Sequence, residues 1–100
     1  GGLSLGAIGA VGSTYNYMSS YYHEIINYFE SGNIDEARKI QQFSVKVVEI
    51  LNKNGGGVRT GKAIMEIIGI DCGPSRAPLK NFSSTERNKL IEDLRLINFF

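Results

Sequence analysis

The chain has few of the residues from which rigid covalent frameworks are built, and it lacks tryptophan. It contains one cysteine, no tryptophan, two prolines and one histidine in 100 residues. A single cysteine excludes an internal disulfide framework, and it is typical of proteins from a reducing compartment. We therefore expect a cytoplasmic protein whose fold rests on packing and hydrogen bonds.

Neither positive nor negative side chains are in clear excess. Eleven Lys and Arg residues stand against ten Asp and Glu residues, and the basic ones are scattered along the chain. This balance gives no electrostatic footprint for nucleic acid or an anionic membrane. No apolar run approaches the ~20 residues that a membrane span needs, and the apolar start lacks the positive charges of a signal peptide. We expect neither nucleic acid nor a membrane as a partner.

Small apolar residues are abundant near the beginning of the chain. Residues 6–12 read Gly-Ala-Ile-Gly-Ala-Val-Gly, with no polar alternation. Such a run predicts a strand buried on both faces of a parallel sheet. A parallel strand needs hydrogen-bonding neighbours, and no later segment supplies them. We interpret the chain as the tail of a larger α/β enzyme, because in a free-standing protein this strand would be an exposed, aggregation-prone edge.

Four helices are predicted after this strand. They run from Ser13 or Thr14 to Gly32, from Asn33 to the glycines at 55–57, from Thr60 to Ile68, and from Ser83 onward. Asn33 with Glu36, and Ser83 with Glu86, have the spacing of capping boxes. Two prolines and a glycine exclude a helix over residues 71–79.

The most specific part of the sequence is the run over residues 6–17, which continues the predicted strand through Ser-Thr-Tyr-Asn-Tyr. It resembles the last barrel strand of the dihydrodipicolinate synthase/N-acetylneuraminate lyase family, and especially its sialic acid aldolases. Later segments agree with that family in order and spacing: Gly57-Val58, Lys62-Ala63-Ile64-Met65, Gly69-Ile70, Gly73-Pro74-Ser75-Arg76 and Pro78-Leu79.

The resemblance implies an α/β fold, the C-terminal part of a (β/α)₈ barrel. Residues 1–31 would form the last strand and helix, and residues 32–100 a C-terminal helical extension, so that the chain itself is mostly α. Members of the family are class I aldolases, commonly homotetramers, that use no metal or dissociable cofactor. A lysine forms a Schiff base with pyruvate and a tyrosine assists proton transfer. Both lie on earlier strands, so we expect no catalytic residue in this chain and no activity from it alone.

The resemblance also makes Ser13 a substrate-binding residue, for a small-molecule substrate such as sialic acid or pyruvate. Its position agrees, because barrel ligands bind where strands end and where a helix N-terminus offers free N–H groups. Ser13 would also suit an N-cap, and the two roles are compatible. His23 has no partners arranged for a metal site, and the glycines at 6, 9 and 12 fit no nucleotide-binding fingerprint.

Other residues are assigned structural roles. Tyr15 and Tyr17 are expected to pack, Lys62 to occupy a structural position, and Cys72 to pack. Arg76 is expected to pin the irregular stretch to the barrel by bonds to carbonyl groups, with a substrate role as the second choice. Two alternatives for function stay open. One is a non-catalytic helical interaction module or truncated paralogue, and the other is an aldolase for a different 2-oxo acid.

Overall fold

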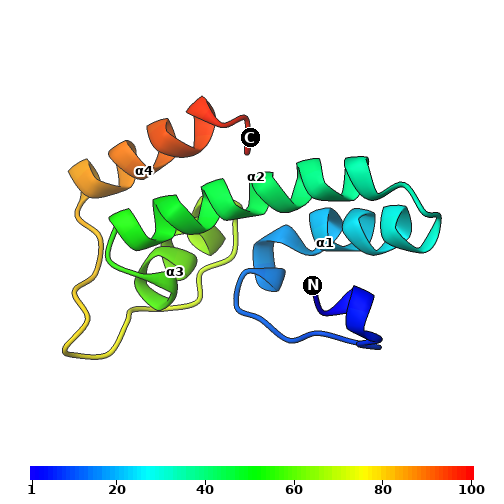
Figure 1. Ribbon diagram of the computed structural model, residues 1–100. Helices are drawn as coiled ribbons and strands as arrows, with labels where there is room; N and C mark the ends of the chain where they lie inside the picture. The colour runs from blue at the N-terminus through cyan, green and yellow to red at the C-terminus, as the bar shows by residue number, and fades with distance from the viewer. The chain divides into compact units, whose positions relative to one another are not determined.

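The computed structural model describes all 100 residues, and its regular elements are all helical (Figure 1). They are the 3₁₀ turn η1 (Leu3–Leu5) and the helices α1 (Tyr15–Glu30), α2 (Ile34–Lys53), α3 (Gly57–Ile67) and α4 (Ser84–Leu96). The four predicted helices are confirmed, although α3 begins at Gly57 rather than at Thr60. The chain divides into two compact units, residues 1–44 and 45–100, and α2 runs from the first into the second. The predicted boundary at residues 31 and 32 stays a prediction.

The strand predicted over residues 6–12 is not formed. Ile8 and Val11 are fully exposed, and Leu5 just before them is 89 % exposed. The amide groups of residues 8–11 find no hydrogen-bond partner within the chain. The physical reason is that a strand is stabilised by its neighbours, and an isolated apolar run has none. The sequence pattern describes what this segment would do inside a sheet, which these 100 residues do not contain.

Helix α1 has a kinked beginning and a well-defined end. Met18 is fully buried and has non-helical backbone angles, φ −129° and ψ 18°. The helix is kinked there, and the first turn of α1, ahead of Met18, is set at an angle to the rest of the helix (Figure 1). At the other end Gly32 has φ 81°, and its amide and that of Asn33 bond back to Phe29 and Tyr28. This is a Schellman motif, which confirms the predicted glycine stop.

Aromatic side chains cover much of α1. The rings of Tyr15 and Tyr22 lie 4.4 Å apart, and those of Tyr21 and Phe43 lie 5.0 Å apart. The Tyr17 side chain packs so that its hydroxyl oxygen is buried without a hydrogen-bond partner. Desolvation by burial, helped by the nearby Tyr22 phenol, raises the pKa of Tyr17 to about 12. The predicted packing of Tyr15 and Tyr17 is confirmed.

The second unit has a core of apolar residues contributed by three helices. The fully or almost fully buried ones are Val47, Leu51, Ala63, Ile64, Leu90 and Leu94. Thr60 is also completely buried, and its hydroxyl donates to the carbonyl oxygens of Leu51 and Asn54. The Leu51 carbonyl belongs to the last turn of α2, where carbonyls lack an i+4 partner within the helix, and Asn54 directly follows the helix. Thr60 therefore ties the beginning of α3 to the end of α2.

Arg59 holds the irregular stretch that follows α3. Its guanidinium group donates to carbonyl oxygens of Asn54, Lys80 and Asn81. It also pairs with the carboxylate of Glu86 and stacks 4.0 Å from the centre of the Phe82 ring. Its side chain is only 12 % exposed. All three nitrogen atoms of the guanidinium group are thus used, and they join α3 to the residue after α2, to the stretch and to the start of α4.

Within this chain Arg76 does not hold the irregular stretch, and the expectation that it pins the stretch to the barrel stays a prediction. Arg76 is exposed, and its side chain makes no hydrogen bond or ion pair. Arg59 and Lys62 hold the stretch instead, and the Lys62 ammonium donates to the Pro74 carbonyl at 2.8 Å. The predicted structural role of Lys62 is therefore confirmed. Cys72 was expected to pack, but it is an exposed free thiol.

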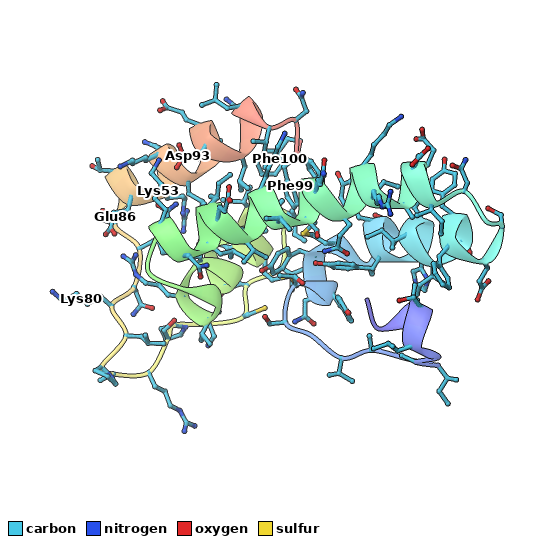
Figure 2. The ribbon with its side chains drawn as sticks, in the orientation of Figure 1. Lys53, Lys80, Glu86, Asp93, Phe99 and Phe100 are labelled. Carbon is cyan, nitrogen blue, oxygen red and sulfur yellow. The ribbon has the colours of Figure 1, made fainter.

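Helix α4 begins with the predicted capping box. The Ser83 hydroxyl accepts from the Glu86 amide, and the Glu86 carboxylate accepts from the Ser83 amide, both at 3.2 Å. The hydrogen bond from Arg59, followed by the one from the Ser83 backbone, lowers the pKa of Glu86. Further along the helix, Asp93 lies 3.5 Å from the Lys53 ammonium of α2 (Figure 2).

Replacement of Arg59 by methionine is expected to destabilise the chain. The variant keeps an aliphatic stem but loses all the bonds to carbonyl groups, and a hydrogen bond from a charged donor contributes about 1.5–3 kcal/mol. We expect the free energy of unfolding in urea to fall by about 2–3 kcal/mol. Arg38→Met is the matched control, because its ion pair with Asp35 is highly exposed and should contribute less than about 0.5 kcal/mol. Equal effects of the two substitutions would contradict the role given to Arg59.

Tyr17→Phe is expected to leave stability at pH 7 unchanged or to raise it, because the substitution removes a buried hydroxyl that has no partner. In the wild type the folded pKa exceeds the unfolded value of 10.0. The unfolded chain therefore loses this proton first, and stability declines as the pH rises from about 10 to about 12. Urea unfolding at several pH values should show a smaller decline in Tyr17→Phe than in the wild type. Tyr28→Phe on the same helix is the control, and identical declines in all three proteins would refute the burial effect.

Candidate functional site

The candidate site is the turn that leads into α1, residues 12–17. Its backbone is wound tightly: the amides of Tyr15, Asn16 and Tyr17 each bond to the carbonyl three residues earlier. Only at Met18, whose amide bonds to Thr14 at 2.9 Å, does the four-residue helical spacing begin. Short 3₁₀ segments of this kind are common at helix starts. The turn presents Ser13 at the exposed entrance to the helix.

Ser13 lies where the sequence placed it, at the start of the helix, but it is not the N-cap. The N-cap is Thr14, and neither hydroxyl accepts a bond from the amides of the first helical turn. The Ser13 carbonyl accepts from the Asn16 side-chain amide at 2.9 Å. Its hydroxyl is exposed and makes no hydrogen bond within the chain. The capping alternative is therefore wrong, and substrate contact stays a prediction.

The Thr14 hydroxyl is occupied by a partner further along α1. It lies 2.7 Å from the Tyr22 hydroxyl, in a part-buried position where either oxygen can donate. The Tyr22 ring in turn packs against Tyr15, which belongs to the same turn. The sequence did not single out Tyr22 for this contact. Residues eight apart do not share the usual neighbour spacing of a helix face, so no periodicity points to the pair.

The turn offers hydrogen-bond donors to a ligand, but it places no base beside a hydroxyl to activate it for acid–base or nucleophilic chemistry. The Ser13 hydroxyl and the amide groups of Ser13 and Thr14 donate to no atom of the chain, and donors at a helix start suit an oxygen-rich or anionic ligand. A tyrosine is already uncharged at neutral pH at its ordinary pKa of 10.0, and burial raises the pKa of Tyr17 further, to about 12, so Tyr17 adds no charge here. His23 is exposed on α1, as expected for a solvated helix residue.

A hollow of about 360 Å³ lies in the unit of residues 45–100. It is lined by charged side chains from α3 and α4, including Lys62, Glu66 and Arg87. These groups are already bonded, since Glu66 pairs with Arg87 and Lys62 with the Pro74 carbonyl. The cations of this hollow are therefore already engaged in holding the unit together.

Metal-binding clusters and membrane-spanning helices are both absent from the structure. No three or more His, Cys, Asp or Glu side chains gather in a way that could hold a metal ion. None of the helices combines the length and the apolar character that crossing a membrane requires.

Comparison with known proteins gives a consistent match. The model of the Dihydrodipicolinate synthetase family matches residues 1–97. N-acetylneuraminate lyase of Rhizobium meliloti (strain 1021) is 36 % identical over 92 residues, which are 91 % of this chain and 30 % of the relative. N-acetylneuraminate lyase A of Xenopus laevis is 44 % identical over 80 residues, which are 79 % of this chain and 26 % of the relative.

The structural comparison agrees. The structure of Proteus mirabilis N-acetylneuraminate lyase superposes with a TM-score of 0.89 at 33 % identity, over 99 % of this chain and 33 % of that one. The predicted fold class is confirmed: the chain is mostly α and has the fold of the C-terminal part of a (β/α)₈ barrel with its helical extension. It spans about a third of the length of the relatives that it matches. On this evidence the chain belongs to the dihydrodipicolinate synthetase family.

Proposed function

We propose that this chain is the C-terminal portion of an N-acetylneuraminate lyase, a class I aldolase that cleaves N-acetylneuraminate to N-acetylmannosamine and pyruvate. The observation that carries the proposal is the agreement of relatives from a bacterium and a vertebrate, at 36 % and 44 % identity, with the structural match. All three proteins have that name. The catalytic lysine and tyrosine would lie in the part of the enzyme outside this chain.

The chemistry of a class I aldolase requires that the substrate be held in place, and we propose that this chain helps to hold it. In a class I aldolase the lysine amine condenses with the substrate ketone, releasing water, and the resulting iminium accepts the electron pair of the breaking C–C bond. The substrate must be held in place while this happens. The Ser13 hydroxyl and the amides of Ser13 and Thr14 are uncharged donors without partners in the chain. They suit the carboxylate of a 2-oxo acid, and Ser13 is proposed as the substrate-binding residue.

The chain alone is proposed to be inactive. Lys62, a lysine in the segments that resemble the family, is bonded to the Pro74 carbonyl in the helical extension. This bond gives Lys62 a structural role, and it is not proposed as the Schiff-base lysine. The helices from Asn33 onward would cover the barrel and support contacts between subunits of a homotetramer.

The breadth of the family supports one alternative, an aldolase that acts on a different 2-oxo acid. The matching family model is named for dihydrodipicolinate synthetase rather than for the sialic acid enzyme. Pyruvate release from N-acetylneuraminate, compared with release from other 2-oxo acids of similar size, separates the two. A preference for another acid would keep the aldolase class and change the substrate.

Replacement of Ser13 by alanine in the full-length enzyme is expected to weaken substrate binding. A hydrogen bond to a charged group contributes about 1.5–3 kcal/mol, which corresponds to a rise in KM of roughly ten- to hundredfold. Because Ser13 holds substrate and transfers no proton, kcat should change much less than KM. The measurement is steady-state pyruvate release from N-acetylneuraminate. Ser20→Ala, an exposed serine on α1, is the matched control, and an unchanged KM in Ser13→Ala would contradict the assignment.

A further inference from the structure

The hydrogen bond between Thr14 and Tyr22 joins the turn that carries Ser13 to the body of α1. The two hydroxyl oxygens lie 2.7 Å apart in a part-buried position. Thr14 is the N-cap of the helix, a position whose hydroxyl ordinarily accepts a bond from the first helical turn. Here that capping bond is absent, and the Thr14 hydroxyl is bonded to Tyr22 instead.

The kink at Met18 helps to make this bond. Eight residues of straight α-helix rise about 12 Å, which is a long way for one side chain to bridge. Helical side chains point towards the N-terminus, so Tyr22 reaches back over the turn before it. The non-helical angles at Met18 set the first turn of α1 off from the rest (Figure 1). A residue in such an unusual conformation, beside a candidate site, points to a functional constraint.

Two more contacts hold the same turn. The Tyr15 and Tyr22 rings lie 4.4 Å apart and are tilted by 57°, and the Asn16 side chain donates to the Ser13 carbonyl at 2.9 Å. Ser13 is therefore flanked on its C-terminal side by residues that are fixed to α1, while its own hydroxyl stays unbonded and exposed. All the holding groups are uncharged, so none of them competes with Ser13 for an anionic ligand.

We propose that Tyr22 is a positioning residue for substrate binding: through Thr14 it fixes the orientation of the Ser13 hydroxyl towards the carboxylate of a 2-oxo acid. This inference rests on the proposed function, because it assigns Tyr22 to the substrate contact of that reaction. Tyr22 itself does not touch the substrate. Loss of its hydroxyl leaves Ser13 in place but less well oriented.

The test is a double-mutant cycle in the full-length enzyme, with pyruvate release from N-acetylneuraminate as the assay. Tyr22→Phe keeps the ring contact with Tyr15 and removes only the hydroxyl. It should lower kcat/KM by about three- to tenfold, mainly through KM. In the Ser13→Ala background the same substitution should have an effect below about twofold, because there is no Ser13 hydroxyl left to orient.

Further variants separate positioning from general destabilisation. Thr14→Val should reproduce the effect of Tyr22→Phe, and Thr14→Ser, which retains the hydroxyl, should stay near the wild type. Tyr28→Phe is the matched control on the same helix and should leave kcat/KM within about twofold of the wild type. Thermal unfolding of each variant shows whether a loss of activity follows a loss of structure.

Each outcome decides the inference. Non-additive losses at Ser13 and Tyr22, with Thr14→Ser near the wild type, support it. Equal losses from Tyr22→Phe in both backgrounds, no loss at all, or the same loss from Tyr28→Phe would overturn it while the proposed function stands. If the wild-type enzyme releases no pyruvate from N-acetylneuraminate, the proposed function fails and this inference fails with it.

Discussion

The requirement of a parallel strand for hydrogen-bonding neighbours governs what this chain can form. The run over residues 6–12 has the composition of a strand that is covered on both faces, yet it lies open with Ile8 and Val11 fully exposed. Backbone groups in a β-segment are satisfied by other strands, and no other strand is present. Helices satisfy their own backbone groups, so the regular structure that remains is entirely helical. The turn that bears Ser13 thus follows an unpaired segment and depends on α1 for its shape.

Within the second unit, order in the irregular stretch depends on α3. Residues 71–82 contain two prolines and form no helix, so their carbonyl groups need donors from elsewhere. Arg59 and Lys62 supply these donors, and Arg59 reaches from the end of α2 to the start of α4. A guanidinium group suits this task because its donors are spread in a fixed fork. The helical extension is therefore joined by two cations, Arg59 and Lys62, as well as by its apolar core.

Local sequence signals predicted the helices well. The stop of α1 at Gly32 and the capping box at Ser83 and Glu86 depend on residues within a few positions of each other, and both were confirmed. The predicted strand was wrong for this chain because a strand depends on partners that the local sequence does not specify. The site was predicted in part. The exposed position of Ser13 at the start of the helix followed from the strand-to-helix pattern, but the hydrogen bond between Thr14 and Tyr22 did not.

Contacts between distant residues explain the remaining differences. Arg76 stands between two prolines and was expected to pin their stretch to the barrel, whereas within this chain the end of the stretch is held by Arg59, seventeen positions earlier. Which arginine reaches a carbonyl depends on how α3 packs, and spacing alone does not reveal it. The pairing of Thr14 with Tyr22 likewise depends on the backbone angles of Met18, a residue that carries no helix-breaking signal.

The central claim is the proposal that this chain is about one third of a longer aldolase polypeptide. The most direct test is the mass of the native polypeptide, from source material, that yields peptides spanning Lys62 to Arg76. A polypeptide of about 300 residues is predicted, because a barrel with an extension has that size and the matched 92 residues are 30 % of the Rhizobium meliloti relative. A stable native species of the present length would contradict the claim, since the predicted strand would then lack its sheet.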